Sequence, residues 1–323
     1  MFRTTLSLSP SSFQLNHQTA VLTLGSCFAD AMGSRFLRDK FQVCKNPFGV
    51  LFNPLSAFHL LESVINLQFP EDNTFIEREG IYFNYNLHSD FSGKSLKELQ
   101  NKIQETFETT NNFLKTSQYL ILTFGTAIIY QIKDSDQTVA NCHKMPAQLF
   151  HKRLLRSEEI ELTFKKLYKL LKTFNPAIRM ILTVSPIRHI KDTLELNAVS
   201  KSTVRIACHH LESRFEDVEY FPSYEIMMDD LRDYRFYSQD MLHPTEVAEE
   251  YIWEKFSNRY FSQKTQNLLI EWTKLRKAIT HRPFHPESNA HQAFLKKTIQ
   301  KLENLSNKID VSREMAHLKN QLI

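Results

Sequence analysis

The sequence has 323 residues, which is enough to bury a full hydrophobic core and suits one large domain with an appendage better than several small domains. Forty basic residues against 36 acidic residues give a net charge of +4. That bias is too weak to indicate nucleic-acid binding, and no stretch interleaves aromatic with basic residues as a stacking groove would require.

The N-terminal segment, MFRTTLSLSPSSF, has no apolar core and no small-residue cleavage site, so it does not read as a secretory signal. The longest apolar stretch, residues 119–130, is too short to span a membrane and is interrupted by Gly125. We therefore expect a cytoplasmic protein without a membrane span. Its cysteines should be free thiols, and no C-x-x-C pair indicates zinc. The cysteines are Cys27, Cys44, Cys142 and Cys208.

The first half of the chain alternates strand-like and helix-like runs. Residues 20–24 predict a short buried strand, and residues 27–40 predict a helix with Phe28, Met32 and Phe36 on one face. Further along, the pattern predicts strands over 41–45 and 119–124, a hairpin over 74–88, and helices over 54–66 and 95–115.

The second half repeats this alternation. It predicts a hairpin on either side of residues 133–137, a buried strand over 179–186, and helices over 157–174, 196–215 and 244–261. Strands that are apolar on both faces and alternate with helices are typical of parallel sheets. We therefore expect an α/β fold in which an open, doubly wound parallel sheet carries helices on both faces.

The character of the sequence changes after residue 262, so we expect a main domain over 1–262 and a helical C-terminal extension over 263–323. Within the extension, Leu295, Leu302 and Ile309 lie seven residues apart. Two interpretations remain open. The helix packs on its own chain, or it offers a partner surface for a homodimer. Two heptads are too few to identify a coiled coil.

Three of the six glycines, Gly25, Gly49 and Gly125, lie just beyond predicted strand ends. In open α/β sheets the active site lies at the carboxyl ends of the strands. Ser26 would begin the helix over 27–40, where free N–H groups and the positive end of the helix dipole favour an oxyanion. The alternative is that Ser26 is only a helix cap, since serine is common there.

A serine needs a base to become a nucleophile. Among thirteen histidines, His243 stands out because Asp240 precedes it by three residues on a tight segment and Pro244 follows it. A carboxylate at that spacing can hold one imidazole nitrogen while the other nitrogen faces outward as a base. The alternative is a capping aspartate beside a surface histidine.

The segment GSCFA at residues 25–29 resembles the signature of the GSCFA-domain family, which is similar to SGNH (GDSL-type) hydrolases. The resemblance continues through further blocks and spans residues 20–256. It implies a three-layer αβα, flavodoxin-like domain with a Ser–His–Asp hydrolase site. The further blocks are NPFGVLFNP (46–54), LTFGTA (122–127), NCHK (141–144), ILTVSPIRH (181–189), YFPSYEI (220–226) and DMLHP (240–244).

Carried over position by position, the resemblance implies that Ser26 is the nucleophile, His243 the base and Asp240 its orienting partner. It also implies that the backbone N–H groups of Ser26 and Gly49 form an oxyanion hole. SGNH enzymes usually carry Gly-x-Asn after the third catalytic strand, whereas this chain has Gly125 followed by Thr126 and Ala127. The missing donor has three candidate replacements, namely Asn141, Asn53 and the Thr126 hydroxyl.

Other polar residues near strand ends are candidates for substrate binding. Asn53 and His143 belong to this group, with a surface position as the alternative for His143. Arg188 and His189 follow a predicted strand at its carboxyl end, where they could bind an anionic substrate group. An internal ion pair is the alternative for Arg188.

These residues favour a serine hydrolase that acts on an acyl or acetyl ester of a small molecule or a carbohydrate, without a metal or other cofactor. The same intermediate could transfer the acyl group to a sugar hydroxyl. A second hypothesis is a non-catalytic binding or assembly protein on the same scaffold, since fold does not determine function. A third is a reactive thiol at Cys27.

Overall fold

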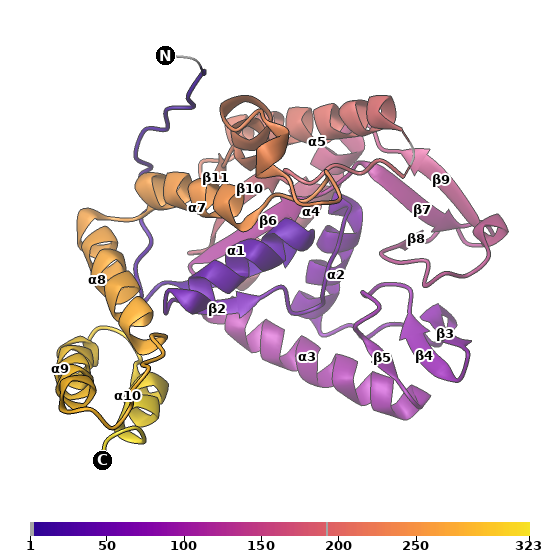
Figure 1. Cartoon of the computed structure of the whole chain (residues 1–323). Coiled ribbons are helices and arrows are strands. Elements are labelled where there is room, and N and C mark those ends of the chain that lie inside the picture. Colours follow the sequence, from indigo (N-terminus) through magenta and orange to yellow (C-terminus); the bar gives the residue numbers. More distant parts are fainter. Residues whose placement is uncertain (1–2, 192) are drawn as a thin grey trace.

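The computed structural model describes residues 3–191 and 193–323 (Figure 1). Strands and helices alternate along most of the chain, as the sequence pattern predicts. The strands are β1 (Ala20–Gly25), β2 (Gln42–Lys45), β3 (Phe75–Arg78), β4 (Ile81–Asn84), β5 (Ser92–Gly93), β6 (Tyr119–Phe124), β7 (Ile128–Ile132), β8 (Thr138–Val139), β9 (Phe150–Leu154), β10 (Arg179–Val184) and β11 (Val218–Tyr220). The helices are α1 (Cys27–Arg38), α2 (Pro54–Asn66), α3 (Leu96–Thr116), α4 (Ser157–Phe174), α5 (Leu194–Arg214), α6 (Ser223–Glu225), α7 (Glu246–Tyr260), α8 (Gln263–Ile279), α9 (Asn289–Leu305) and α10 (Ser312–Lys319).

The central sheet has five parallel strands in the order β2-β1-β6-β10-β11. This order confirms the predicted doubly wound sheet. The chain moves from β1 to β2 in one direction and then crosses back to β6 on the other side of β1. The order therefore reverses between β1 and β6, and their carboxyl ends form the crevice where such folds bind ligands.

Helices cover both faces of the sheet and make three layers, because alternate residues of each strand point to opposite faces. Leu22 and Leu24 of β1 join the cluster formed with α2, α3, α4 and α5. Val21 of β1 and Ile121 of β6 join the cluster formed with α1 and α7.

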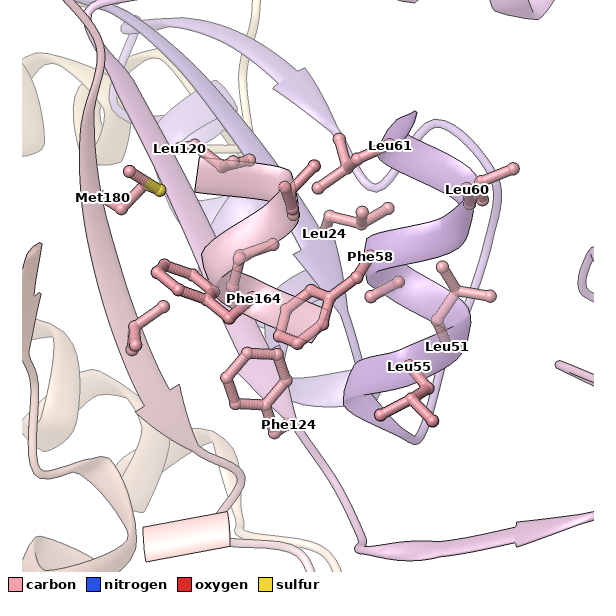
Figure 2. Packing of buried hydrophobic residues seen from close by; sticks show 14 of the residues in the cluster. Leu24, Leu51, Leu55, Phe58, Leu60, Leu61, Leu120, Phe124, Phe164 and Met180 are labelled. Carbon is pink, nitrogen blue, oxygen red and sulfur yellow. The ribbon is translucent and has the colours of Figure 1, made fainter. Parts of the chain in front are cut away.

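Figure 2 shows part of the first cluster, in which Phe58 of α2, Phe124 of β6 and Phe164 of α4 face one another. The ring of Phe58 meets Phe124 edge-on at a centroid distance of 5.6 Å and Phe164 at 5.5 Å. Offset and edge-on contacts of this kind are the favourable arrangement for aromatic rings. They fix α2 and α4 against β6, whose end borders the crevice.

Two small antiparallel sheets stand beside the carboxyl end of the central sheet, with orders β3-β4-β5 and β8-β7-β9. They include the two predicted hairpins, and Gly80 turns the first with a φ of 76°. Tyr85, Val139 and Phe150 form a shared cluster that joins the two sheets.

Helices α8, α9 and α10 enclose a separate cluster that includes Trp272, Leu295, Leu302 and Ile309. The residues spaced by seven are therefore buried within the chain, and Ile309 lies beyond the end of α9 at Leu305. These side chains are not exposed to a second copy, so a homodimer through the helices would need a different face.

The structure differs from the sequence-based expectations at some elements. Strands β9 and β11 were not predicted, because β9 reads as FHKRL and β11 has only three residues. Helix α7 begins at Glu246 and not at Pro244, with the Thr245 side chain as its cap. Within the described residues, no helix combines the length and apolar character that crossing a bilayer requires.

Candidate functional site

The crevice between β1 and β6 is shaped by Gly25. Its φ of 139° lies outside the range that side chains favour, and an added Cβ would lie 2.1 Å from the carbonyl oxygen of Thr123 on β6. Only glycine fits there. The chain can therefore run close to β6 and deliver Ser26 directly at the carboxyl end of the sheet.

Ser26 is the N-cap of α1, and its Oγ accepts a hydrogen bond from the Phe28 N–H at 3.3 Å. The residue is buried, and its own N–H donates to the Thr123 carbonyl at 3.0 Å. Ser26 therefore caps α1, as the alternative interpretation predicts. No acceptor for the hydroxyl proton is found among residues 3–191 and 193–323, so the cap leaves that proton free for other chemistry.

Asp240 and His243 form the pair that their spacing predicts. Asp240 Oδ2 lies 2.5 Å from His243 Nδ1, while Asp240 Oδ1 accepts hydrogen bonds from the N–H groups of Leu242 and His243. These two backbone donors, with the imidazole, lower the pKa of Asp240 to about 2. Asp240 is therefore ionised at neutral pH and fixes the orientation of the His243 ring. Both side chains are about half exposed.

Arg188 lies against the loop that carries this pair. Its guanidinium lies over the rings of Tyr234 and Tyr237, with centroid distances of 5.4 Å and 4.4 Å. These are cation–π contacts, and the predicted alternative of an internal ion pair is not what the structure shows. Because Arg188 follows β10 and the tyrosines precede Asp240, the contacts hold this loop at the carboxyl end of β10.

The ring of His189 borders Ser26 more closely than sequence reasoning indicated. A Cβ added at Gly125 would lie 2.9 Å from His189 Nε2 and 3.4 Å from Ser26 Cβ, so both groups pack closely against Gly125. The Nε2 atom is covered from solvent and has no hydrogen-bond partner among the described residues. Burial lowers the pKa of His189 to about 4, and Lys201 and His243 act in the same direction.

Ser26 and His243 are not joined by a hydrogen bond anywhere in the described part of the chain. The contacts of Arg188 with Tyr234 and Tyr237 hold the loop that carries His243 at the carboxyl end of β10, the strand that His189 follows. The structure thus brings Ser26, His189 and the Asp240–His243 pair to one end of the sheet. Direct contact between the hydroxyl and the His243 ring stays a prediction.

The two backbone N–H groups that we expected in an oxyanion hole are already engaged. The Ser26 N–H donates to Thr123, and the Gly49 N–H donates to the Asn46 carbonyl at 2.9 Å. Gly49 has a φ of 71°, and a Cβ there would lie 2.7 Å from that of His88, so glycine is required for packing.

The three candidates for the missing amide donor also have partners. Asn53 caps α2 through Ser56, with bonds of 2.8 and 3.0 Å. Thr126 Oγ1 lies 2.8 Å from Ser200 Oγ, and Asn141 Nδ2 donates to Ser89 Oγ at 3.2 Å. All three residues stand close to the crevice, but their side chains serve the fold as it stands.

His143 lies in the loop between β8 and β9 and packs against the first small sheet. Nε2 lies 2.8 Å from the Asn84 carbonyl, Nδ1 lies 3.2 Å from Ser89 Oγ, and the ring stacks on Phe83. It is buried, so the predicted surface alternative is wrong, and both ring nitrogens are occupied.

A cavity of about 460 Å³ opens beside His189. Asn53, Thr126, Asn141 and His189 contribute to its lining, so four of the predicted site residues border it. The rest of its wall is mainly apolar and comes from the second small sheet, the loop between β8 and β9, the residue before Asn53 and the loop after β10. That part consists of Phe52, Ile128, Tyr130, Val139, Ala140, Cys142, Lys144, Met145, Ala147, Phe150 and Lys191.

Two alternative chemistries find less support at this site. Burial raises the pKa of the Cys27 thiol, which disfavours the thiolate that nucleophilic attack requires. No cluster of three or more histidine, cysteine, aspartate or glutamate side chains that could hold a metal occurs within the described residues.

Sequence reasoning missed Lys201 of α5. Its side chain is buried, and Nζ donates to the Ser185 carbonyl at 2.7 Å. Burial lowers the pKa of Lys201 to about 7. The sequence around it reads as an ordinary helix and contains no signal that would have singled it out.

Together, these features define a three-layer αβα protein in which Ser26 follows β1 at the switch point of the sheet and packs, with His189, close to Gly125. A family model described as the GSCFA family matches residues 20–256. This match covers most of the chain, and the chain belongs to the GSCFA family. A second model, described as the C-terminal domain of GSCFA domain proteins, matches residues 272–323. A search of curated proteins finds no match.

Proposed function

We propose that this chain is a serine hydrolase of the SGNH type, which cleaves an acyl or acetyl ester through a seryl-acyl intermediate. The observation that carries the proposal is the Asp240–His243 pair, held at 2.5 Å at the same end of the sheet as Ser26. An ionised carboxylate on Nδ1 leaves Nε2 as the base for a serine hydroxyl.

In this mechanism Ser26 Oγ attacks the ester carbonyl carbon while His243 accepts the hydroxyl proton. The C–O bond then breaks, and the leaving alkoxide takes that proton from His243. Water repeats the sequence and releases the acid. The exposed ring of His243 must contact Ser26 when substrate is bound, and catalytic hydrogen bonds often form fully only in such complexes.

The cavity beside His189 would hold one side of the ester. Its volume of about 460 Å³ and apolar wall suit a short acyl chain or the body of a small alcohol, and Lys144 and Lys191 add positive charge. A carbohydrate hydroxyl that replaced water in the second step would make the same protein an acyltransferase.

The test uses a fluorophosphonate probe and p-nitrophenyl acetate. Wild-type protein should react with the probe and release p-nitrophenol, and Ser26→Ala should do neither. Because Ser26→Ala also removes a helix cap, at a cost of about 0.5–2 kcal/mol, Ser26→Gly serves as a second variant with a smaller cost. Ser34→Ala, an exposed serine on the same helix, is the matched control and should behave like wild type.

A second candidate function is a binding or assembly protein on the same scaffold. The observation that favours it is that the N–H groups of Ser26 and Gly49 are both committed to backbone carbonyls. A folded wild-type protein that neither reacts with the probe nor hydrolyses the ester would reject the hydrolase and leave this candidate.

A further inference from the structure

The site lacks an obvious partner for the negative oxygen that forms when Ser26 attacks an ester. This step rests on the proposed function. The Ser26 and Gly49 N–H groups donate to backbone carbonyls, and the position that carries the amide donor in SGNH enzymes is Ala127. A hydrolase with this geometry needs a donor from elsewhere.

His189 Nε2 is a buried polar atom close to Ser26 that has no hydrogen-bond partner among the described residues. It lies close to Gly125, and Ser26 Cβ lies close to the same point of the backbone. Glycine at position 125 permits this close packing, since a Cβ there would come within 2.9 Å of Nε2, 3.0 Å of the Phe52 carbonyl oxygen and 3.4 Å of Ser26 Cβ. A buried polar atom without a hydrogen bond is costly, and a ligand oxygen that accepts a hydrogen bond from Nε2 would remove that cost.

The neighbours of His189 hold the ring in place. Its backbone N–H donates to Asn197 Oδ1 of α5 at 2.9 Å, and the Phe52 ring packs edge-on against the imidazole at 5.4 Å. The ring is thus supported from α5 and from the loop before α2. Such support is what a preorganised donor requires.

Burial, and the charged groups that face His189, keep it neutral. Burial is the largest cause of its low pKa, followed by Lys201 on α5 and His243 on the catalytic loop. A ring with a pKa of about 4 carries one proton at neutral pH, on either Nδ1 or Nε2. A neutral N–H can donate a hydrogen bond without losing its proton, whereas a group with so low a pKa is a poor base.

We infer that His189 donates a hydrogen bond from Nε2–H to the oxyanion of the tetrahedral intermediate, in place of the amide side chain that Ala127 lacks. When Ser26 Oγ bonds to the carbonyl carbon, the π electrons move to the carbonyl oxygen, and His189 stabilises that charge. Its proton stays on Nε2. The proton of Ser26 goes to His243, which later gives it to the leaving alkoxide.

The kinetic test compares His189→Ala and His189→Gln with wild type, with p-nitrophenyl acetate as substrate. Loss of one oxyanion donor should lower kcat by about 100- to 1,000-fold with little change in KM. The Gln amide can place an N–H close to the former Nε2, so kcat of His189→Gln should be at least about tenfold higher than that of His189→Ala. His209→Gln, an exposed histidine on α5, is the matched control.

A second measurement does not depend on activity. The ¹⁵N spectrum of the His189 ring should show a neutral imidazole with its proton on Nε2 at pH 7, and should do so in the Ser26→Ala protein as well. A proton on Nδ1 would overturn the inference, as would a charged ring.

Three further outcomes separate the explanations. A His189→Ala protein within about threefold of wild type would overturn the inference and leave the hydrolase intact. An acid limb of the pH–rate profile that moves in His189→Gln would assign His189 as the base instead. A wild-type protein that fails to react with a fluorophosphonate would reject the hydrolase, and the inference with it.

Discussion

The side chains around Ser26 divide into those that hold a charge and those that avoid one. Asp240 is ionised because two backbone N–H groups and the His243 ring surround its oxygens. Lys201 and His189 are pushed toward their neutral forms by burial. In the proposed mechanism, the negative charge of Asp240 stays at the rim while a neutral donor, His189, faces the oxyanion.

Asp240→Asn should lower kcat by about 100-fold or more, because the amide no longer stabilises the charged imidazole that forms on His243. The Asn Oδ1 still accepts from the N–H groups of Leu242 and His243, so the loop should remain folded. Ester hydrolysis at pH 7 measures the effect, with the exposed Asp229→Asn as control. Since the pKa of Asp240 is about 2, its protonation should not shape the wild-type rate above pH 4.

Lys201→Met should remove a pH dependence of stability. The pKa of Lys201 is about 7 in the folded protein and 10.5 is its ordinary value, so between these values the unfolded chain binds the extra proton. Wild-type stability attributable to Lys201 therefore rises with pH from 7 to 10.5, and the folded state is penalised below pH 7. Between pH 7 and pH 10.5, the difference in unfolding free energy between wild type and Lys201→Met should change by a few kcal/mol, because each unit of pKa shift corresponds to about 1.4 kcal/mol.

Urea unfolding of both proteins at pH 7, 8.5 and 10 provides the measurement. The unfolding free energy of Lys201→Met should exceed that of wild type by the largest amount at pH 7, and this difference should shrink as the pH rises. A gap that stays constant over this range would show that Lys201 titrates normally. The Ser185 carbonyl loses its donor in the variant, which offsets part of the gain equally at every pH.

At the scale of elements, α1 connects two regions of the molecule. It begins at Ser26, beside the crevice, and ends at Arg38, where the C-terminal helices dock. The Arg38 carbonyl accepts from Trp272 Nε1 at 2.9 Å, and Lys40 pairs with Glu314 at 2.6 Å. The helix that positions the serine is therefore anchored at both ends.

The elements of the crevice were predictable from local patterns, and its interior was not. A buried strand that ends in Gly25 before a helix predicts that Ser26 lies at the start of that helix. The three-residue spacing predicts that Asp240 can reach His243. The direction of His189 Nε2 depends on how α5 packs against the loop after β10, which no local pattern encodes. The same holds for Arg188, whose tyrosine partners lie more than forty residues away in the chain.

The loop between β8 and β9 forms part of the cavity wall, and this gives a test of the substrate pocket. Ala147→Trp should fill part of the cavity, because Ala147 lines it and is exposed. The ratio of kcat/KM for a longer acyl ester, such as the hexanoate, to kcat/KM for the acetate should be lower in this variant than in wild type by about tenfold or more. Gln148→Trp introduces the same side chain at the next residue, which does not line the cavity, and should leave the ratio unchanged. Equal effects of the two variants would place the acyl chain elsewhere.

At the scale of the whole molecule, two hydrophobic cores share one helix. Leu269 of α8 packs in the cluster with α1 and α7, whereas Trp272 and Leu275 pack in the cluster with α9 and α10. The boundary that we predicted at residue 262 thus coincides with the start of α8, and the second family match begins farther along the helix, at residue 272. A helix that belongs to both cores should make them unfold together.

Trp272→Ala should separate the two cores. The side chain is 1% exposed, donates to the Arg38 carbonyl and lies under Lys40 Nζ at 5.2 Å, so its removal should cost about 3–5 kcal/mol. That loss falls on the small helical cluster, whereas the sheet and its crevice keep their own core.

Thermal unfolding of wild type should show one transition, and the variant should show an earlier loss of part of its helical signal while reaction with the fluorophosphonate persists. Ile270→Ala, at an exposed position of the same helix, should retain the single transition. If Trp272→Ala loses helical signal and probe reactivity together, the helical extension is an integral part of the main fold, and its contact with the end of α1 is needed to hold Ser26 in place.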